Sequence, residues 1–151
     1  MRVIIQRVSS ASVSVDGEVV GSCGPGLLLL VGIHRDDESG GLKKVADKVS
    51  NLRIFNDGEG KMNLSLLDLP EGERGILAVS NFTVYGNAEK SRRPSFSDSA
   101  GFEKASTLFE QFVAALKETG IPVGTGVFGA DMQVSLLNDG PVTLVLDRPT
   151  A

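Results

Sequence analysis

The stretch SNFTVYG, residues 80–86, gathers polar side chains directly after an apolar run. Ser80 and Thr83 carry hydroxyls, Asn81 carries an amide, and the aromatic Phe82 stands between them. Hydrogen-bond donors at the end of a strand are suited to holding a carbonyl or an ester. A polar strand end that leads into a turn also explains the pattern. No base stands nearby in the sequence to activate a nucleophile.

A second stretch, EKSRRPSF at 89–96, is the most basic part of the chain. It places Lys90, Arg92 and Arg93 within four residues. Arginine forks match the geometry of phosphate oxygens, so this segment is a candidate phosphate contact. A solvated charged loop is the alternative interpretation.

A third stretch, NDGPVT at 138–143, separates the apolar runs MQVSLL and LVLD. Asp139 and Gly140 are typical of a two-residue hairpin turn. Pro141 then removes an amide hydrogen from the returning strand, which an ordinary turn does not require. Glycine permits close approach of a backbone, and only about 5–6% of X–Pro bonds in folded proteins are cis. General frequencies therefore favour a trans turn here.

The whole chain limits the chemistry available to these residues. Its 151 residues, 41% hydrophobic and 23% charged, predict one globular domain over 1–151. With Cys23 the only cysteine and His34 the only histidine, neither a disulfide nor a thiolate metal site is expected, and no metal or cofactor is predicted. A net charge of −4 argues against broad nonspecific binding of nucleic acid. The absence of a long apolar run and of a signal segment predicts a cytoplasmic protein without a membrane span.

The elements that must position the polar stretches follow from the apolar periodicity. Helical spacing predicts one helix over 40–52, with Ser39 as a possible N-cap, and a second whose apolar stripe runs from Phe102 to Leu116. Several hairpin-linked strands with two main helices favour an α+β domain with a mostly antiparallel, barrel-like core and helices on one face. The expected strands cover residues 1–8, 11–15, 18–23, 27–33, 76–80, 132–137 and 141–147, the last two paired as a hairpin.

Taken together, these motifs resemble the D-aminoacyl-tRNA deacylases, dimeric proofreading enzymes that remove D-amino acids from tRNA. The similarity runs nearly end to end, from MRVIIQRVSSASVSVDGEVVGSCGPGLLLLVGI through DKVSNLRIFNDGEGKMNLSLLD, SNFTVYG and KSRRPSF to GVFGADMQVSLLNDGPVT. The resemblance implies a homodimer that hydrolyses the ester between a D-aminoacyl group and the terminal adenosine of tRNA. Glycyl-tRNA, whose aminoacyl group lacks a side chain, is expected to escape exclusion in part.

The resemblance also implies roles for single residues. The Gly140–Pro141 bond is expected to be cis and inserted into the active site of the partner subunit, where backbone oxygens would exclude an L side chain. Ser80, Asn81, Phe82 and Thr83 correspond to the family motif SQFT and would shape the catalytic pocket. Arg7 would brace the Gly140–Pro141 loop, Met132 would line the pocket, and Lys90, Arg92 and Arg93 would contact tRNA.

Two questions stay open from the sequence. Thr83 either polarises the scissile carbonyl or attacks it, and positioning is favoured because the family is thought to use the 2′-hydroxyl of the terminal adenosine. Asn81 stands where the motif has glutamine, about one methylene longer, so a catalytic contact through its side chain is in question while a main-chain role survives. The competing class of function is a non-catalytic RNA-binding or protein-interaction module on the same fold.

Overall fold

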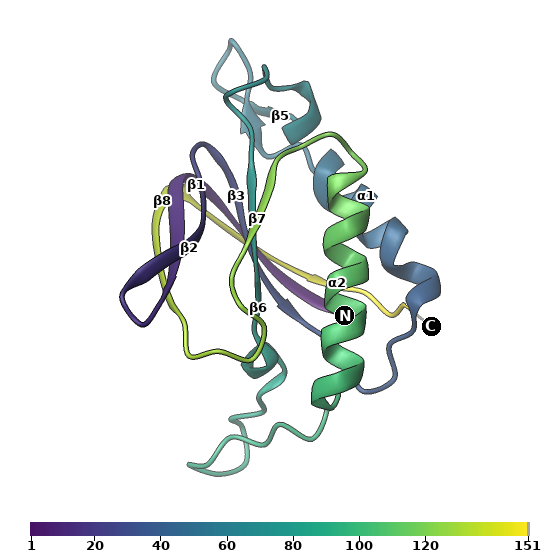
Figure 1. Ribbon diagram of the computed structural model, residues 1–151. Helices are drawn as coiled ribbons and strands as arrows, with labels where there is room; N and C mark the ends of the chain where they lie inside the picture. Colours follow the sequence, from purple (N-terminus) through teal and green to yellow (C-terminus); the bar gives the residue numbers. More distant parts are fainter. Residues whose placement is uncertain (151) are drawn as a thin grey trace.

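The computed structural model describes residues 1–150, whose sheet is organised around the long strand β1 (Arg2–Val15) (Figure 1). On one edge, successive halves of β1 pair antiparallel with β3 (Gly26–Gly32) and β2 (Glu18–Cys23). On the other edge, β1 pairs antiparallel with β8 (Gln133–Asp147). The sequence predicted separate strands at 1–8 and 11–15. They are one strand because both halves have a neighbour on each edge.

The sheet continues from β3 through two parallel pairings. β6 (Ile76–Ser80) pairs with β3, and β7 (Val123–Thr125) pairs with β6. β7 then meets β2, since a Cβ added to Gly21 would lie only 2.2 Å from the carbonyl oxygen of Thr125. The result is the expected α+β fold with a nearly closed, barrel-like sheet. Antiparallel pairs predominate among the described residues, but the parallel pairs were not predicted.

β8 corrects the predicted hairpin. Leu137 pairs with Ser10 and Leu144 pairs with Ile5, so the segments on both sides of Gly140 pair with β1 and not with each other. The register shifts between Gln6 and Val8, where residues 139–142 bulge out opposite a single residue of β1. The turn signal was local, whereas the long ladder offered by β1 decides where both apolar segments pair.

Two helices lie side by side on one face of the sheet, α1 (Leu42–Asn51) and α2 (Phe102–Lys117) (Figure 1). Both bury the apolar stripes expected from their spacing against the sheet. Two details differ from the prediction. The N-cap of α1 is Gly41 and not Ser39, which opens the short 3₁₀ turn η1 (Ser39–Gly41). Phe102 is exposed, because its ring contacts Phe128 instead of the core.

Short elements complete the chain. The turn-rich region after α1 contains the small antiparallel pair β4 (Phe55–Asn56) and β5 (Met62–Leu64), which the sequence did not predict. Two further 3₁₀ turns follow, η2 (Leu66–Asp68) and η3 (Phe82–Tyr85). Within residues 1–150, no helix is long and apolar enough to cross a membrane.

Candidate active site

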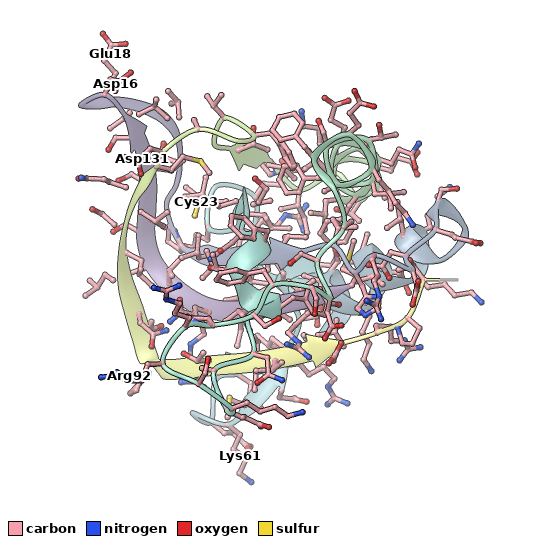
Figure 2. The ribbon with its side chains drawn as sticks, turned by 90° about the horizontal axis from the view of Figure 1, so that it is seen from below. Asp16, Glu18, Cys23, Lys61, Arg92 and Asp131 are labelled. Carbon is pink, nitrogen blue, oxygen red and sulfur yellow. The ribbon has the colours of Figure 1, made fainter. Side chains whose placement is uncertain are left out.

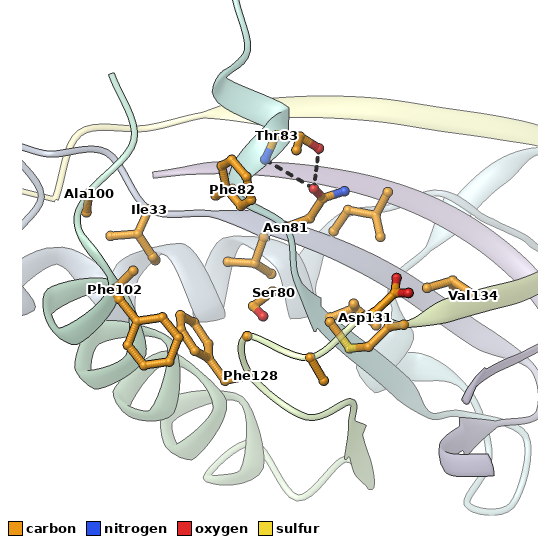
Figure 3. A pocket seen from close by; sticks show the side chains of 17 residues that line it. Ile33, Ser80, Asn81, Phe82, Thr83, Ala100, Phe102, Phe128, Asp131 and Val134 are labelled. Carbon is orange, nitrogen blue, oxygen red and sulfur yellow. Dashed lines mark hydrogen bonds between the residues drawn. The ribbon is translucent and has the colours of Figure 1, made fainter. Parts of the chain in front are cut away.

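A cavity of about 620 Å³ opens beside the end of β6 (Figure 3). Its walls come mainly from four parts of the chain: Ser80 with η3, the start of α2, the loop that joins β7 to β8, and the end of β3. The first wall contributes Ser80, Asn81, Phe82 and Thr83, and the third contributes Phe128 and Met132. The polar stretch found in the sequence therefore faces a real concave site and is not only a strand end.

Strand β6 places the polar stretch. Its residues from Ile76 to Val79 are buried, so the strand is fixed in the core and ends where Ser80 reaches the cavity. The chain then turns into η3, with Asn81 in extended conformation as the N-cap. The side-chain oxygen of Asn81 accepts hydrogen bonds from the backbone N–H of Thr83 at 3.2 Å and from its hydroxyl at 2.5 Å (Figure 3).

These hydrogen bonds settle how the polar groups are oriented. The Thr83 hydroxyl donates its proton to Asn81, and an amide oxygen is not a base that could activate it. Within residues 1–150, the hydroxyl of Ser80 and the backbone N–H of Phe82 have no hydrogen-bond partner. Both lie on residues that line the cavity, so two donors are free to meet an oxygen atom of a ligand.

The opposite wall is mainly apolar. The ring of Phe128 meets that of Phe102 edge to face, with centroids 5.1 Å apart. Met132 lies close to the chain at Gly126, where a Cβ would approach its sulfur. Asp131 is the only titratable residue among the described residues that line this cavity. An apolar wall opposite hydrogen-bond donors suits a ligand that combines apolar surface with a hydrogen-bond acceptor.

The Gly140–Pro141 segment does not line this cavity. Its peptide bond is cis, so the trans turn favoured by general frequencies is wrong. Arg7, only 7% exposed, donates from Nε to the carbonyl of Asp139 at 3.1 Å and from Nη1 to that of Ile54 at 2.7 Å. Arg7 thus contacts the loop for which the family resemblance implied it.

Space around the loop is restricted. Gly140 has φ +126°, and a Cβ there would lie 2.9 Å from Nη2 of Arg7. The side-chain amide of Asn138 donates to the carbonyls of Arg7 and Val142, each at 3.0 Å. Gly140 and Pro141 are both exposed. The loop that carries them is held in place by the hydrogen bonds from Arg7 and Asn138.

The basic segment also lies outside the cavity. Its base is closed by backbone hydrogen bonds between Asn87 and Ser95, at 2.7 and 2.9 Å. Lys90, Arg92 and Arg93 are all exposed, and no ion pair within residues 1–150 involves them. Arg92 projects at the edge of the molecule (Figure 2).

Two side chains near the site, Tyr85 and Cys23, have raised pKa values, so neither can act as a general base at neutral pH. Burial raises the pKa of Tyr85 well above its usual range, and the carboxylates of Asp37 and Asp147 raise it further. Burial also raises the pKa of the Cys23 thiol. Both groups therefore stay protonated at neutral pH. Among the described residues there is no cluster of His, Cys, Asp and Glu that could hold a metal ion.

Comparison with known proteins decides the family. A family model described as D-Tyr-tRNA(Tyr) deacylase matches residues 4–147. The chain belongs to this deacylase family. It is 52% identical to a D-aminoacyl-tRNA deacylase of Clostridium botulinum (strain Eklund 17B / Type B), over 97% of each chain. It is 55% identical to a D-aminoacyl-tRNA deacylase of Thermosipho africanus, again over 97% of each chain.

Solved structures agree with this deacylase fold. The chain superposes with a TM-score of 0.90 on a protein titled c-Myc DNA Unwinding Element Binding Protein, at 38% identity and covering 99% of each chain. It superposes with a TM-score of 0.80 on a probable eukaryotic D-amino acid tRNA deacylase, covering 97% of this chain and 98% of that one. At 19% identity, the second likeness shows the fold alone.

In this member of the deacylase family, the sequence analysis found one wall of the cavity and missed most of the other. Ser80 to Thr83 and Met132 meet as expected from the resemblance. Phe102, Phe128 and Asp131 line the same cavity but were not singled out. Nothing local in the motif GVFGADM singles out Phe128 or Asp131, because both reach the cavity only through the tertiary approach of their loop to β6.

Proposed function

We propose that the chain hydrolyses the ester that joins a D-aminoacyl group to the terminal adenosine of tRNA. Family membership makes it a hydrolase of the aminoacyl-tRNA ester. The observation that carries the assignment to a site is the pair of unpartnered donors, the Ser80 hydroxyl and the Phe82 N–H, at the cavity beside β6. The same proposal includes the cytoplasmic location predicted from the sequence and, in part, activity on glycyl-tRNA.

The donors suit the carbonyl oxygen of the scissile ester. As water adds to the carbonyl carbon, negative charge grows on this oxygen, and fixed N–H and O–H groups stabilise it. The bond from that carbon to the ribose oxygen then breaks, a proton from the attacking water passes to that oxygen, and the amino acid and free tRNA are released. Thr83 helps to position η3 and is not the nucleophile, because its proton is held by Asn81. We assign activation of water to the 2′-hydroxyl of the terminal adenosine.

Stereochemical selection requires a second copy of the chain. Gly140 and Pro141 are exposed and do not line the cavity of their own chain, which supports a role for them at the cavity of a second subunit. β8 exposes apolar side chains on both sides of the bulge, with Leu137 before it and Val145 after it. An exposed apolar strand of this kind is suited to association. The function therefore includes a homodimer in which each loop completes the partner's site.

The loop then selects handedness by exclusion. Its backbone oxygens would accept the amino group of a D-residue, while an L side chain in the same pose would collide with the loop. The hydrogen bonds from Arg7 and Asn138 restrict the retreat of this wall. A 10⁴-fold preference corresponds to about 5.5 kcal/mol, which a steric clash against a braced backbone can supply.

The basic segment completes the substrate contact. Lys90, Arg92 and Arg93, which form no ion pair within residues 1–150, offer three cations to the phosphates of tRNA on a chain whose net charge is −4. A local basic patch on an acidic body favours one orientation of the nucleic acid over general binding.

The decisive test compares D-Tyr-tRNA with L-Tyr-tRNA under single-turnover conditions. We expect release of D-tyrosine at least 10³ times faster than release of L-tyrosine. Equal rates, or no D-specific release, would reject the proposal. Binding of uncharged tRNA without turnover of either ester would favour the alternative, a non-catalytic RNA-binding module.

The dimer is tested separately, by light scattering after gel filtration. We expect the mass of two chains for the wild type. Gly140→Ala should lose D-specific release while keeping its fold, because the new Cβ would displace the Arg7 guanidinium from the loop. A monomer with full D-specific activity would contradict the shared site but not the hydrolysis itself.

A further inference from the structure

Phe82, an exposed residue that lines the cavity, stands against a second exposed ring, that of Phe96, which is not among the lining residues. Phe82 is 58% exposed and Phe96 is 38% exposed, which is unusual for phenylalanine. Their ring centroids are 5.2 Å apart with planes at 72°, an edge-to-face pair. In such a pair the ring that gives its edge keeps both of its faces clear of the other ring. Figure 3 shows Phe82 and Ser80 among the side chains that line the cavity.

The local backbone fixes both rings. The ring of Phe96 packs on Gly86, where a Cβ would lie 2.8 Å from its Cε1 atom. The hydroxyl of Ser99 donates to the carbonyl of Phe82 at 2.9 Å. The Asn87–Ser95 backbone hydrogen bonds close the loop immediately before Phe96. The pair is therefore organised before any ligand arrives.

Charge beside the pair favours a nucleic acid. The loop that ends at Phe96 carries Lys90, Arg92 and Arg93 against one acid, Glu89. Their side chains are exposed and form no ion pair within residues 1–150. Exposed aromatic rings next to unpaired cations are the combination that binds single-stranded nucleic acid, by base stacking and phosphate contact.

We propose that Phe82 and Phe96 form a stacking platform for the unpaired nucleotide that precedes the terminal adenosine of the substrate. The cavity takes the esterified end, so the preceding nucleotide must leave through the mouth, where the platform stands. The cations at 90–93 then meet the phosphates that follow. This inference rests on the proposed function and assigns Phe96 a contact that lies outside the catalytic cavity.

The first test removes the ring of Phe96. Phe96→Ala should lower kcat/KM for D-Tyr-tRNA about tenfold, mainly through KM, since stacking on an aromatic side chain contributes on that scale. Phe96→Leu keeps apolar packing on Gly86 but has no aromatic face, so it should lose nearly as much. Phe96→Trp should restore the wild-type value. Val19→Ala, which removes exposed apolar surface from β2, is the matched control and should change nothing.

A truncated substrate separates this inference from the proposed function. The D-tyrosyl ester of adenosine lacks any preceding nucleotide, so Phe96→Ala should change its hydrolysis by less than twofold. Equal losses on the ester and on tRNA would overturn the platform while leaving the deacylase activity intact. A change in the mass of the dimer would also overturn it, by placing the rings in a subunit interface.

A second readout does not depend on activity. An uncharged tRNA with 2-aminopurine at the position before the terminal adenosine should lose fluorescence on binding to the wild type, because the base stacks. Phe96→Leu should remove most of this change at saturating protein. Quenching that is equal in both proteins would contradict the platform, whatever the deacylation assay shows.

Discussion

Two cavities reach opposite ends of η3 and differ in their polar groups. In one the hydrogen-bond donors are free, and in the other the charged groups are paired with one another. The first, of about 620 Å³, is the candidate active site, with free donors at Ser80 and Phe82. The second, of about 390 Å³, reaches the other end of η3 at Tyr85 and is lined by several charged residues. The larger cavity has almost no charge, whereas the smaller one is crowded with it.

In the second cavity the polar groups satisfy one another. Asp37, 2% exposed, accepts hydrogen bonds from the Met1 amine at 2.7 Å, the backbone N–H of His34 at 2.7 Å and the Thr150 hydroxyl at 3.0 Å. Arg2 lies 4.6 Å from the centre of the Tyr85 ring. Paired charges hold the fold together, while unpaired donors in a nearly uncharged space are available to a substrate.

Asp37→Ala should have the largest effect of all, a decrease in the free energy of unfolding. Removing one partner of a buried ion pair costs about 3–5 kcal/mol, because the remaining charge loses its compensation. Urea denaturation should show this loss. Deacylation per folded molecule should change by less than about twofold. The matched control is Asp36→Ala, whose side chain is 79% exposed and should cost less than about 0.5 kcal/mol. Equal losses in the two variants would contradict the structural role of the second cavity.

Thr83→Ala should have the next largest effect, a decrease in the rate of deacylation. As a positioning residue, Thr83 should account for about a tenfold loss in single-turnover rate, the scale of one hydrogen bond. Thr83→Ser should stay within about twofold of the wild type. If Thr83 were the nucleophile, Thr83→Ala would cost several orders of magnitude. In that case tRNA ending in 2′-deoxyadenosine would react normally; we expect it to be nearly inert.

A smaller effect is expected from Asn81→Gln. The longer side chain moves the oxygen away from the Thr83 N–H, and loss of an N-cap costs about 1 kcal/mol. The free energy of unfolding should fall by about that amount, with a severalfold loss of activity. Asn81→Asp keeps the acceptor at the same place and should retain the stability. A Gln variant that is more active than the wild type would show that the side chain serves the substrate and not the turn.

The smallest effect is expected outside both cavities, from Arg92→Ala or Arg93→Ala. Each should weaken tRNA binding about two- to fourfold, and the log–log dependence of affinity on salt should become shallower by about 0.7–0.9. Lys43→Ala is a control of equal charge, since its ammonium pairs with Glu118 on the helical face at 3.2 Å. A salt slope that is unchanged by the arginine variants would exclude the basic segment from the interface.

The parts of the fold that the sequence predicted depend on local periodicity. Val45, Ala46 and Val49 of α1 are buried as their spacing requires, and so are Phe112 and Leu116 of α2. Helical periodicity is a property of neighbouring residues, so it survives whatever the helix packs against.

The parts that failed depend on distant partners. NDGPVT carries a local turn signal, yet β8 runs through it because β1 is long enough to pair with both sides. Likewise, the end of β6 was recognisable as a polar strand end, but its approach to Phe128 and Asp131 is a tertiary contact with no local signal. The joining of Ser80–Thr83 and Met132 in one site came from the family resemblance and not from spacing.

The seam between β2 and β7 has a consequence for the width of the active site. Two stretches of main chain meet there without side chains between them: a Cβ added to Gly124 would lie 2.9 Å from the carbonyl oxygen of Ser22, and one added to Gly21 would lie 2.2 Å from that of Thr125. The strand on one side of this seam runs straight into the loop that carries Phe128 and Met132. A methyl group added at either glycine would push the two strands apart and shift the loop that carries Phe128 and Met132. The size of the candidate active site therefore depends in part on the absence of side chains at Gly21 and Gly124, which lie outside it.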